Sequence, residues 1–284
     1  MALRVLITGS TGYVGRFLLP SLEKDGHHVV GVSRSSHVKM DLCNSTDCEA
    51  VLREVKPDVI VHTAALSSPA KCEEDEALTR SYNVPRYFAE KAKEVNEHVR
   101  FIFLSTDQVH DGKGRLVGES GDVQPVNVYG KSKLEMETVV QQVFDKYAIF
   151  RMSFVFGPEI EGAHSTFLQF ALDKLRQNKE FDAFSDQIRS CIYIDDVIDA
   201  LRLAVKGHIE GIVNLGGPEA LSRLDFCRIV AKHFGINESI VQGSLYHLPT
   251  PSPADISMNI QRLESVMGRL RSLDEALKIM NPKL

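Results

Sequence analysis

Residues 9–15 read Gly-Ser-Thr-Gly-Tyr-Val-Gly, and they stand between an aliphatic run, Leu3–Thr8, and a stretch with helical spacing, Tyr13–Lys24. Three glycines at this spacing permit a tight turn, a close approach of the backbone to a pyrophosphate, and close packing of a helix on a strand. The start of the helix also offers unpaired N–H groups and a partial positive charge to phosphates. The stretch therefore predicts a dinucleotide-binding loop. The loop residues that we expect at the dinucleotide are Gly9, Thr11, Gly12, Tyr13, Val14 and Gly15.

Strand-like and helix-like segments alternate through the first half of the chain. Short β-branched and aliphatic runs are typical of buried strands in a parallel sheet, and helical spacing marks the segments between them. The expected strands are Leu3–Thr8, His28–Ser33, Asp58–His62, Arg100–Ser105 and Ala148–Met152. The expected helices are Tyr13–Lys24, Ser45–Val55, Glu76–Val95 and Tyr129–Phe144, with a kink or a shifted start at Pro85 in the third. This alternation predicts an α/β fold of the Rossmann type with a doubly wound parallel sheet.

After Gly157-Pro158 the alternation loosens. Helices are expected at Ser165–Gln177, Asp195–Val205, Ser222–Phe234 and Leu273–Met280, and short strands near Phe181–Ser185, Arg189–Ile194 and Ile212–Leu215. We expect residues 1–160 to form the NADP-binding core. Residues 161–284 are expected to form mainly a smaller C-terminal substrate lobe, intertwined with the core as one structural unit. Such a lobe would lie over the strand ends, where ligands of open α/β sheets bind.

The end of the second expected strand indicates the cofactor. NAD enzymes usually carry an acidic residue there, which binds the ribose hydroxyls. This chain instead has Ser33, Arg34 and Ser35 after Gly31-Val32. The planar donor fork of an arginine suits a 2′-phosphate. The sequence therefore predicts NADP(H) rather than NAD(H), with these three residues at the phosphate.

A second cluster of residues points to proton transfer. Tyr129 and Lys133 are four residues apart and share one face of a helix, and Thr106 directly follows the fourth expected strand. Reduction of a carbonyl leaves negative charge on oxygen, which a positioned acid must neutralise. A nearby ammonium lowers the pKa of a phenol and fits it for this task. We therefore expect Tyr129 as proton donor, Lys133 beside it and at the nicotinamide ribose, and the Thr106 hydroxyl at the substrate oxygen.

Several stretches resemble extended short-chain dehydrogenases/reductases. The G-x-x-G-x-x-G spacing of residues 9–15 is that of the family, and residues 105–112 (STDQVHDG) resemble the S-T-D-Y-V-F-D-G signature of dTDP-4-dehydrorhamnose reductases. Residues 125–134 and 151–157 resemble P-x-N-x-Y-G-x-x-K-L and R-x-S-x-V-Y-G of the same group, to which the methionine adenosyltransferase regulatory beta subunit is related. The resemblance covers nearly the whole chain.

The resemblance implies further roles. It makes Thr106, Tyr129 and Lys133 catalytic and implies NADPH-dependent reduction of a 4-keto-6-deoxy sugar attached to a nucleotide. Further cofactor contacts that it implies are Asp41 and Leu42 beside the adenine, the turn Thr63, Ala64 and Ala65, and Asn83 on the next helix. The substrate-pocket candidates are Leu66, Gln108, His110, Phe154 and Val155.

Two departures from the pattern concern the substrate. Gln108 and His110 replace the tyrosine and phenylalanine of the signature, which makes that wall polar. The C-terminal R-P-x-x-S of the sugar reductases is replaced by Ser252–Ser257, which lacks the arginine that would bind a diphosphate bidentately. The leading interpretation is a carbonyl reductase. A non-catalytic NADP-binding regulatory subunit and, more weakly, an epimerase or dehydratase remain as alternatives.

Composition narrows the choice of partner and compartment. A net charge of −5 argues against general nucleic-acid binding, which depends on clustered positive charge. The five cysteines form no C-x-x-C pair, so we expect no metal site and no disulfide framework. We expect no signal peptide and no membrane span, and hence a cytoplasmic protein. The expected partner is a small-molecule carbonyl substrate, and both a homodimer and a complex with an enzyme subunit stay open.

Overall fold

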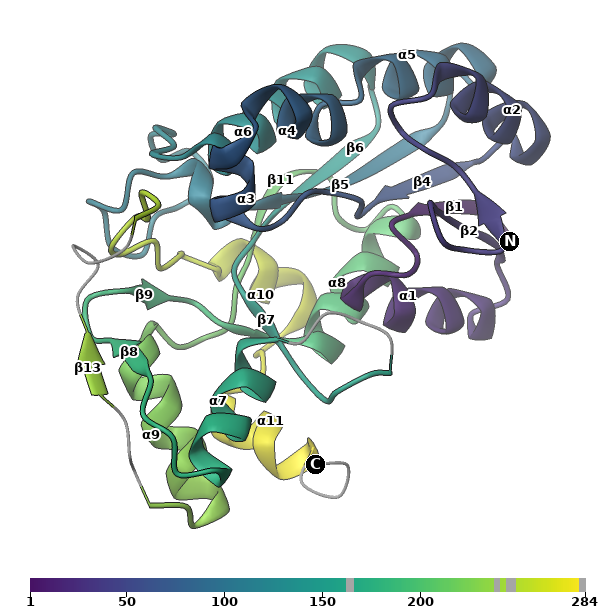
Figure 1. Ribbon diagram of the computed structural model, residues 1–284. Coiled ribbons are helices and arrows are strands. Elements are labelled where there is room, and N and C mark those ends of the chain that lie inside the picture. Colours follow the sequence, from purple (N-terminus) through teal and green to yellow (C-terminus); the bar gives the residue numbers. More distant parts are fainter. Residues whose placement is uncertain (162–165, 238–240, 244–248, 281–284) are drawn as a thin grey trace.

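The computed structural model describes residues 1–161, 166–237, 241–243 and 249–280. Its centre is a seven-stranded, wholly parallel sheet in the order β11-β6-β5-β4-β1-β2-β3 (Figure 1). The strands are β1 (Arg4–Thr8), β2 (His28–Ser33), β3 (Val38–Lys39), β4 (Val59–His62), β5 (Arg100–Thr106), β6 (Tyr147–Met152) and β11 (Gly211–Leu215). This order reverses between β1 and β4, as in a doubly wound Rossmann sheet. The predicted fold class is confirmed.

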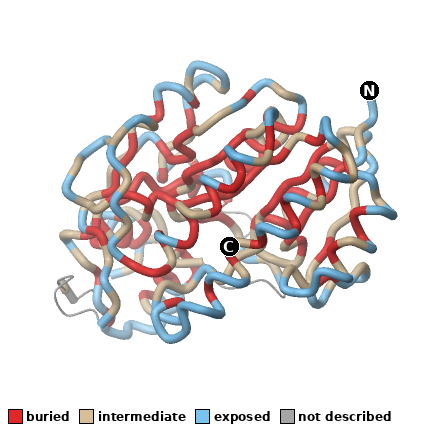
Figure 2. The backbone as a smooth tube through the Cα atoms, turned by 90° about the horizontal axis from the view of Figure 1, so that it is seen from above, coloured by how far each residue is buried: buried red, intermediate tan, exposed pale blue. Residues whose placement is uncertain are grey.

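Helices cover both faces of the sheet because its strands are apolar on both sides. Val5 and Ile7 of β1 belong to one core cluster, and Leu6 between them belongs to the other. The first face packs against α1 (Tyr13–Lys24) and α8 (Ile194–Val205), and the second against α2 (Ser45–Val55), α5 (Arg86–Val95) and α6 (Val128–Val143). Figure 2 shows the buried residues concentrated along the strands and the inner sides of these helices.

The third expected helix is in fact two helices. α4 (Glu76–Asn83) ends before Val84, and α5 begins at Arg86 with Pro85 as its N-terminal cap residue. Proline has no backbone N–H to donate and disfavours helical geometry at the residue before it. The chain therefore breaks at Pro85 instead of bending. Two further elements were not expected from the sequence: the short helix α3 (Pro69–Glu74) and the 3₁₀ turn Asp107–Val109.

A smaller lobe lies beside the carboxyl edge of the sheet (Figure 1). It contains the helices α7 (Phe167–Arg176), α9 (Arg223–Phe234), α10 (Gln261–Met267) and α11 (Leu273–Met280). Its short strands are β7 (Val155–Phe156), β8 (Asp182–Phe184), β9 (Ile188–Arg189), β10 (Ile192–Tyr193), β12 (Leu221–Ser222) and β13 (Val241–Gly243). The first residue of the expected helix Ser165–Gln177 lies outside the described residues.

The expected single strand Arg189–Ile194 is wrong. β9 pairs with β12, whereas β10 pairs with β7, and Ile194 already belongs to α8. The two strands have different partners, so the chain turns between them. Within the described ranges, no helix is long and apolar enough to cross a bilayer.

Candidate active site

The loop after β1 has the backbone that its glycines predict. Gly9 has φ +72°, and a Cβ there would lie 2.7 Å from the backbone N of Ala64. A Cβ at Gly15 would lie 2.5 Å from the carbonyl oxygen of Gly9. Gly9 therefore makes the turn, and Gly15 lets α1 pack directly against it. The first N–H groups of α1 have no partner within the helix and are directed toward the loop.

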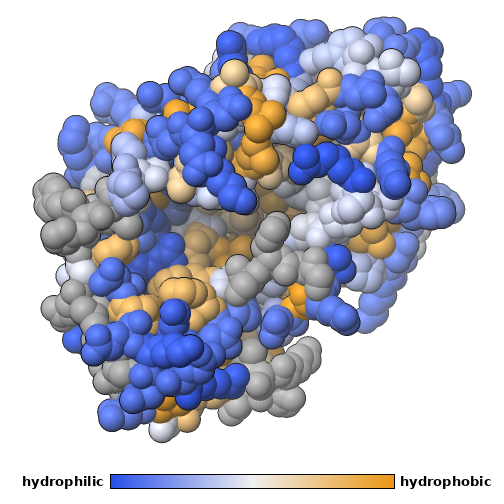
Figure 3. Space-filling model, in the orientation of Figure 1, coloured by the Kyte–Doolittle hydropathy of each residue, from blue (hydrophilic) through white to orange (hydrophobic). Residues whose placement is uncertain are grey.

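A cavity of about 530 Å³ begins at this loop and follows the carboxyl ends of the central strands. This is the crevice at which the strand order reverses, where open α/β sheets bind ligands. Figure 3 shows the molecule hollowed between the part that carries the sheet and the smaller lobe. Sixteen of the predicted site residues line the cavity: Gly9, Thr11, Gly12, Tyr13, Val14, Ser33, Arg34, Ser35, Asp41, Leu42, Thr63, Ala64, Ala65, Leu66, Tyr129 and Lys133.

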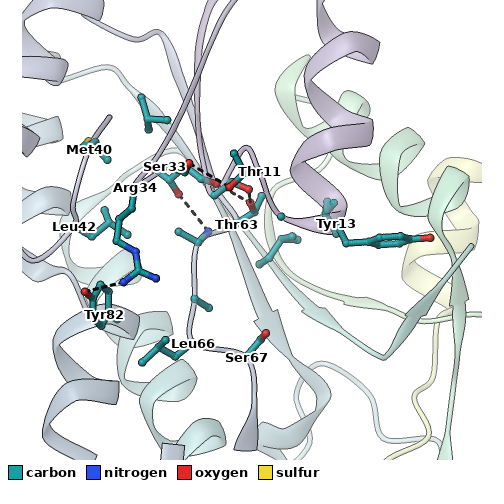
Figure 4. A pocket seen from close by; sticks show the side chains of 18 of the residues that line it. Thr11, Tyr13, Ser33, Arg34, Met40, Leu42, Thr63, Leu66, Ser67 and Tyr82 are labelled. Atoms are coloured by element: carbon teal, nitrogen blue, oxygen red, sulfur yellow. Dashed lines mark hydrogen bonds between the residues drawn. The ribbon is translucent and has the colours of Figure 1, made fainter. Parts of the chain in front are cut away.

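Hydroxyl groups gather beside the Arg34 guanidinium at the outer end of the cavity, which Arg16 also lines. The Ser33 Oγ accepts hydrogen bonds from the Thr11 hydroxyl at 3.2 Å and from the Ser35 backbone N at 3.1 Å. Arg34 extends across the cavity wall, and its Nη1 donates to the Tyr82 hydroxyl at 3.1 Å (Figure 4). A cation with neighbouring hydroxyl donors suits a phosphate group.

The loop after β4 forms the adjoining wall. The Thr63 hydroxyl donates to the carbonyl of Thr8 at 2.7 Å, which ties this loop to the end of β1. Asn83 does not line the cavity. Its Oδ1 accepts from the Leu66 N at 2.8 Å, and its Nδ2 donates to the Ser132 hydroxyl at 3.0 Å. Asn83 therefore fixes the Leu66 loop against α6 instead of facing the cavity.

α6 brings Tyr129 and Lys133 to the inner end of the cavity. Asn127 caps this helix by accepting from the Gly130 N at 2.8 Å, so Tyr129 falls in the first turn and Lys133 one turn later. Thr106 ends β5 and is nearly buried, and its hydroxyl donates to the Asp107 carboxylate at 3.2 Å. The cavity thus has phosphate-type donors at one end and titratable groups at the other.

The electrostatics of Tyr129 differ from the sequence expectation. Burial raises its pKa, as does the nearby Asp107 carboxylate, and the Thr106 hydroxyl acts in the opposite direction. The net shift of the Tyr129 pKa is therefore upward and not downward as expected. The Lys133 ammonium lies over the Phe103 ring, 4.2 Å from its centroid. Burial lowers the pKa of Lys133 to about 7, against the attraction of Glu137. The raised pKa of Tyr129 favours the protonated phenol.

Most of the other substrate-pocket candidates are engaged elsewhere. The Gln108 Oε1 accepts from Asn127 at 2.9 Å, and the buried imidazole of His110 lies 2.8 Å from the carbonyl of Asp122. Val155 pairs in β7 with Ile192, and Phe154 packs edge-on against Phe226 of the smaller lobe. These four residues do not line the cavity. The same is true of three further predicted site residues, namely Gly15, Asn83 and Thr106.

Several lining residues were missed by the sequence reasoning. They are Thr8, Arg16, Val32, Met40, Ser67, Tyr82, Leu104, Ser105 and Met152. Thr8 and Met152 end parallel strands and Ser105 is the last residue but one of β5, and those positions alone could have indicated them. Tyr82 had no such signal, because only the folded chain brings α4 beside the loop after β2. Among the described residues, no group of three His, Cys, Asp or Glu side chains could hold a metal ion.

Comparisons with known proteins agree with this architecture. Residues 3–283 match the family model of the RmlD substrate binding domain. A dTDP-4-dehydrorhamnose reductase of Mycolicibacterium smegmatis is 30% identical over 288 residues, covering 98% of this chain and 85% of that protein. Methionine adenosyltransferase 2 subunit beta of Rattus norvegicus is 29% identical over 248 residues, covering 83% of this chain and 73% of that protein.

Among solved structures, dTDP-4-dehydrorhamnose reductase from Bacillus anthracis in complex with NADP superposes with a TM-score of 0.90 at 21% identity, covering both chains fully. At that identity the likeness establishes the fold. The match over nearly the whole chain establishes more: this protein belongs to the RmlD substrate-binding family.

Proposed function

We propose that this protein is an NADPH-dependent carbonyl reductase of the extended short-chain dehydrogenase type, with Tyr129 as proton donor. The observation that carries the proposal is the single cavity that joins Arg34 and its hydroxyl neighbours to Tyr129 and Lys133. NADP(H) is an elongated ligand with a 2′-phosphorylated adenosine at one end, a pyrophosphate in the middle and the redox-active nicotinamide at the other end. The cavity has Arg34 and hydroxyl groups at its outer end, which suit a phosphate, and Tyr129 and Lys133 at its inner end, which suit the redox reaction.

The choice of NADP(H) rests on the outer end of the cavity. Ser33, Arg34 and Ser35 supply a guanidinium and two hydroxyls where an NAD enzyme would carry a carboxylate. The solved relative from Bacillus anthracis contains NADP, which supports the same cofactor here.

The proposed reaction converts a ketone to an alcohol. Bound NADPH would supply the hydride that the carbonyl carbon accepts. The Tyr129 phenol donates its proton to the carbonyl oxygen. The Thr106 hydroxyl, which donates to Asp107 in this structure, would turn to hold that oxygen. The Lys133 ammonium lies one helical turn from Tyr129. Turned from the Phe103 ring toward the phenol, it would stabilise the phenolate that remains until water returns the proton.

For the substrate we propose the 4-keto group of a nucleotide-linked 6-deoxy sugar. The support is the 30% identity to a dTDP-4-dehydrorhamnose reductase and the match of residues 3–283 to the family model. The segment Ser252–Ser257 has no arginine for the diphosphate. Arg189 lies against this segment, but its guanidinium already donates to the carbonyls of Pro253 and Ala254 at 2.8 and 2.7 Å.

The second candidate is a non-catalytic NADP-binding regulatory subunit. It is favoured by the 29% identity to methionine adenosyltransferase 2 subunit beta. Both candidates use the same cofactor cavity, so the cavity does not discriminate between them. They differ in whether hydride leaves the bound cofactor.

The test is turnover of NADPH with a panel of 4-keto sugar nucleotides and simple ketones, followed by absorbance. We expect Tyr129→Phe to lower kcat at least about 100-fold, because the proton donor is lost, while NADPH affinity stays within a few-fold. Normal turnover by Tyr129→Phe would exclude the proposed role. A silent panel together with co-purification of a methionine adenosyltransferase catalytic subunit would establish the regulatory candidate instead.

A further inference from the structure

Tyr82 stands at the outer end of the cavity and touches Arg34 in two ways. Its hydroxyl accepts a hydrogen bond from Arg34 Nη1 at 3.1 Å, and the guanidinium carbon lies 5.0 Å from the centroid of its ring. Both side chains line the cavity, and Figure 4 shows them meeting beside Leu42. The ring and the hydroxyl together fix both the position and the orientation of the guanidinium.

Arg34 needs such a partner because its own segment does not hold it. It lies on the exposed loop between β2 and β3, and its side chain is solvent-exposed. An exposed arginine samples many rotamers, and ordering it on a ligand costs side-chain entropy. A contact that already orders it in the free protein lowers that cost.

Tyr82 is in contrast well anchored. Its neighbour Asn83 is buried and donates to Ser132 of α6, and Arg80, one half-turn earlier, pairs with Glu135 of α6 at 2.6 Å. α4 is therefore attached to the helix that carries Tyr129 and Lys133. The backbone that carries Tyr82 is therefore held relative to the inner end of the cavity.

We propose that Tyr82 is a positioning residue that holds the Arg34 guanidinium at the cofactor ribose, and thereby sets the preference for the 2′-phosphate of NADP(H). The inference rests on the proposed NADP(H) binding and adds a residue to it. Tyr82 acts through Arg34, so its effect must be confined to ligands that carry the 2′-phosphate.

The experiment measures the affinities of NADPH and NADH by the fluorescence of the reduced nicotinamide. Four proteins are compared: the wild type, Tyr82→Leu, Arg34→Ala, and the double variant. We expect Tyr82→Leu to weaken NADPH binding about three- to tenfold and to leave NADH within twofold. In the Arg34→Ala background, Tyr82→Leu should have no further effect on NADPH, because the residue through which it acts is gone.

Two further variants separate this role from a general loss of structure. Tyr82→Phe keeps the ring and loses the hydroxyl, so it should weaken NADPH binding about two- to threefold. Tyr87→Leu is the matched control: Tyr87 is an exposed tyrosine on α5 that faces Lys91, outside the cavity lining, and its loss should change neither affinity.

The outcomes are distinguishable. A wild type that binds neither dinucleotide overturns the proposed function itself. A wild type that prefers NADPH, with a Tyr82→Leu variant that binds NADPH as well or better, overturns only the role of Tyr82. Equal losses for NADPH and NADH would show a structural role and would also overturn it.

Discussion

The Lys133 ammonium is almost completely buried, and its burial lowers the free energy of unfolding. Its side chain is only 3% exposed, and burial lowers its pKa to about 7, against about 10.4 in an unfolded chain. Below pH 7 the group is charged in both states, so the folded state carries the full desolvation cost. As pH rises from 7 toward 10.4, the folded state loses the proton first and the cost declines.

Replacing Lys133 with methionine should therefore stabilise the protein while abolishing turnover. We expect a gain of about 2 kcal/mol or more in the free energy of unfolding at pH 6, falling by at least half at pH 9. Urea denaturation at the two pH values measures both quantities. A variant less stable than the wild type at pH 6, or a difference independent of pH, would contradict the assignment of a costly buried ammonium.

α6, which carries Tyr129 and Lys133 at the cavity, is tied to the core by a buried ion pair. Glu137, one turn after Lys133, is 1% exposed and binds Arg151 of β6 at 2.9 Å and the Ser105 hydroxyl of β5 at 2.5 Å. Arg151 also donates to the carbonyl of Glu119 at 3.0 Å. One carboxylate thus fastens α6 to two strands that end at the cavity.

Removing that charge should be costly because Arg151 would stay buried without its partner. We expect Glu137→Gln to lower the free energy of unfolding by about 3 kcal/mol, measured by urea denaturation at pH 7.5. Glu135→Gln on the same helix is the control: its pair with Arg80 is exposed, so its loss should cost less than about 1 kcal/mol. Equal effects of the two substitutions would show that the buried pair contributes no more than the exposed one.

At the scale of the whole molecule, the two halves of the chain share one sheet. β11 pairs with β6 along its full length, and α8 covers the same face of the sheet as α1. Both elements come from residues beyond 160. Residues before and after position 160 therefore pack in one core, and side chains of the smaller lobe such as Phe226 and Leu277 belong to the same cluster as Val5 and Ile7 of β1.

A fragment of residues 1–160 should consequently fail to fold on its own. It would expose the apolar face that α8 covers and leave β6 as an open edge, so we expect aggregation or a state without fixed packing. Near-UV circular dichroism and size-exclusion chromatography measure this, with the full chain as the reference. A monomeric fragment with native near-UV signal would show that the first half is an independent domain.

The sequence predicts the main elements and most of the cavity lining, for a physical reason. Gly9, Tyr129 and Lys133 belong to short motifs whose geometry is local, namely a turn and one helical turn. The exposed Arg34 was predicted from its position after β2. Tyr82 could not be predicted in this way, because it contacts Arg34 in space but lies 48 residues from it in the sequence.

The pattern of apolar runs and glycines by itself determined the parallel sheet, its alternation with helices and the loop at the first helix, because these follow from local backbone geometry and the periodicity of burial. Only the tertiary structure determined the charge states of the site residues and the side chains that they contact. The depth to which Lys133 is buried, the pairing of Glu137 with Arg151 and the contact of Tyr82 with Arg34 all depend on segments brought together from distant parts of the chain. Desolvation and hydrogen bonding act over a few ångströms in space, and sequence spacing does not measure those distances.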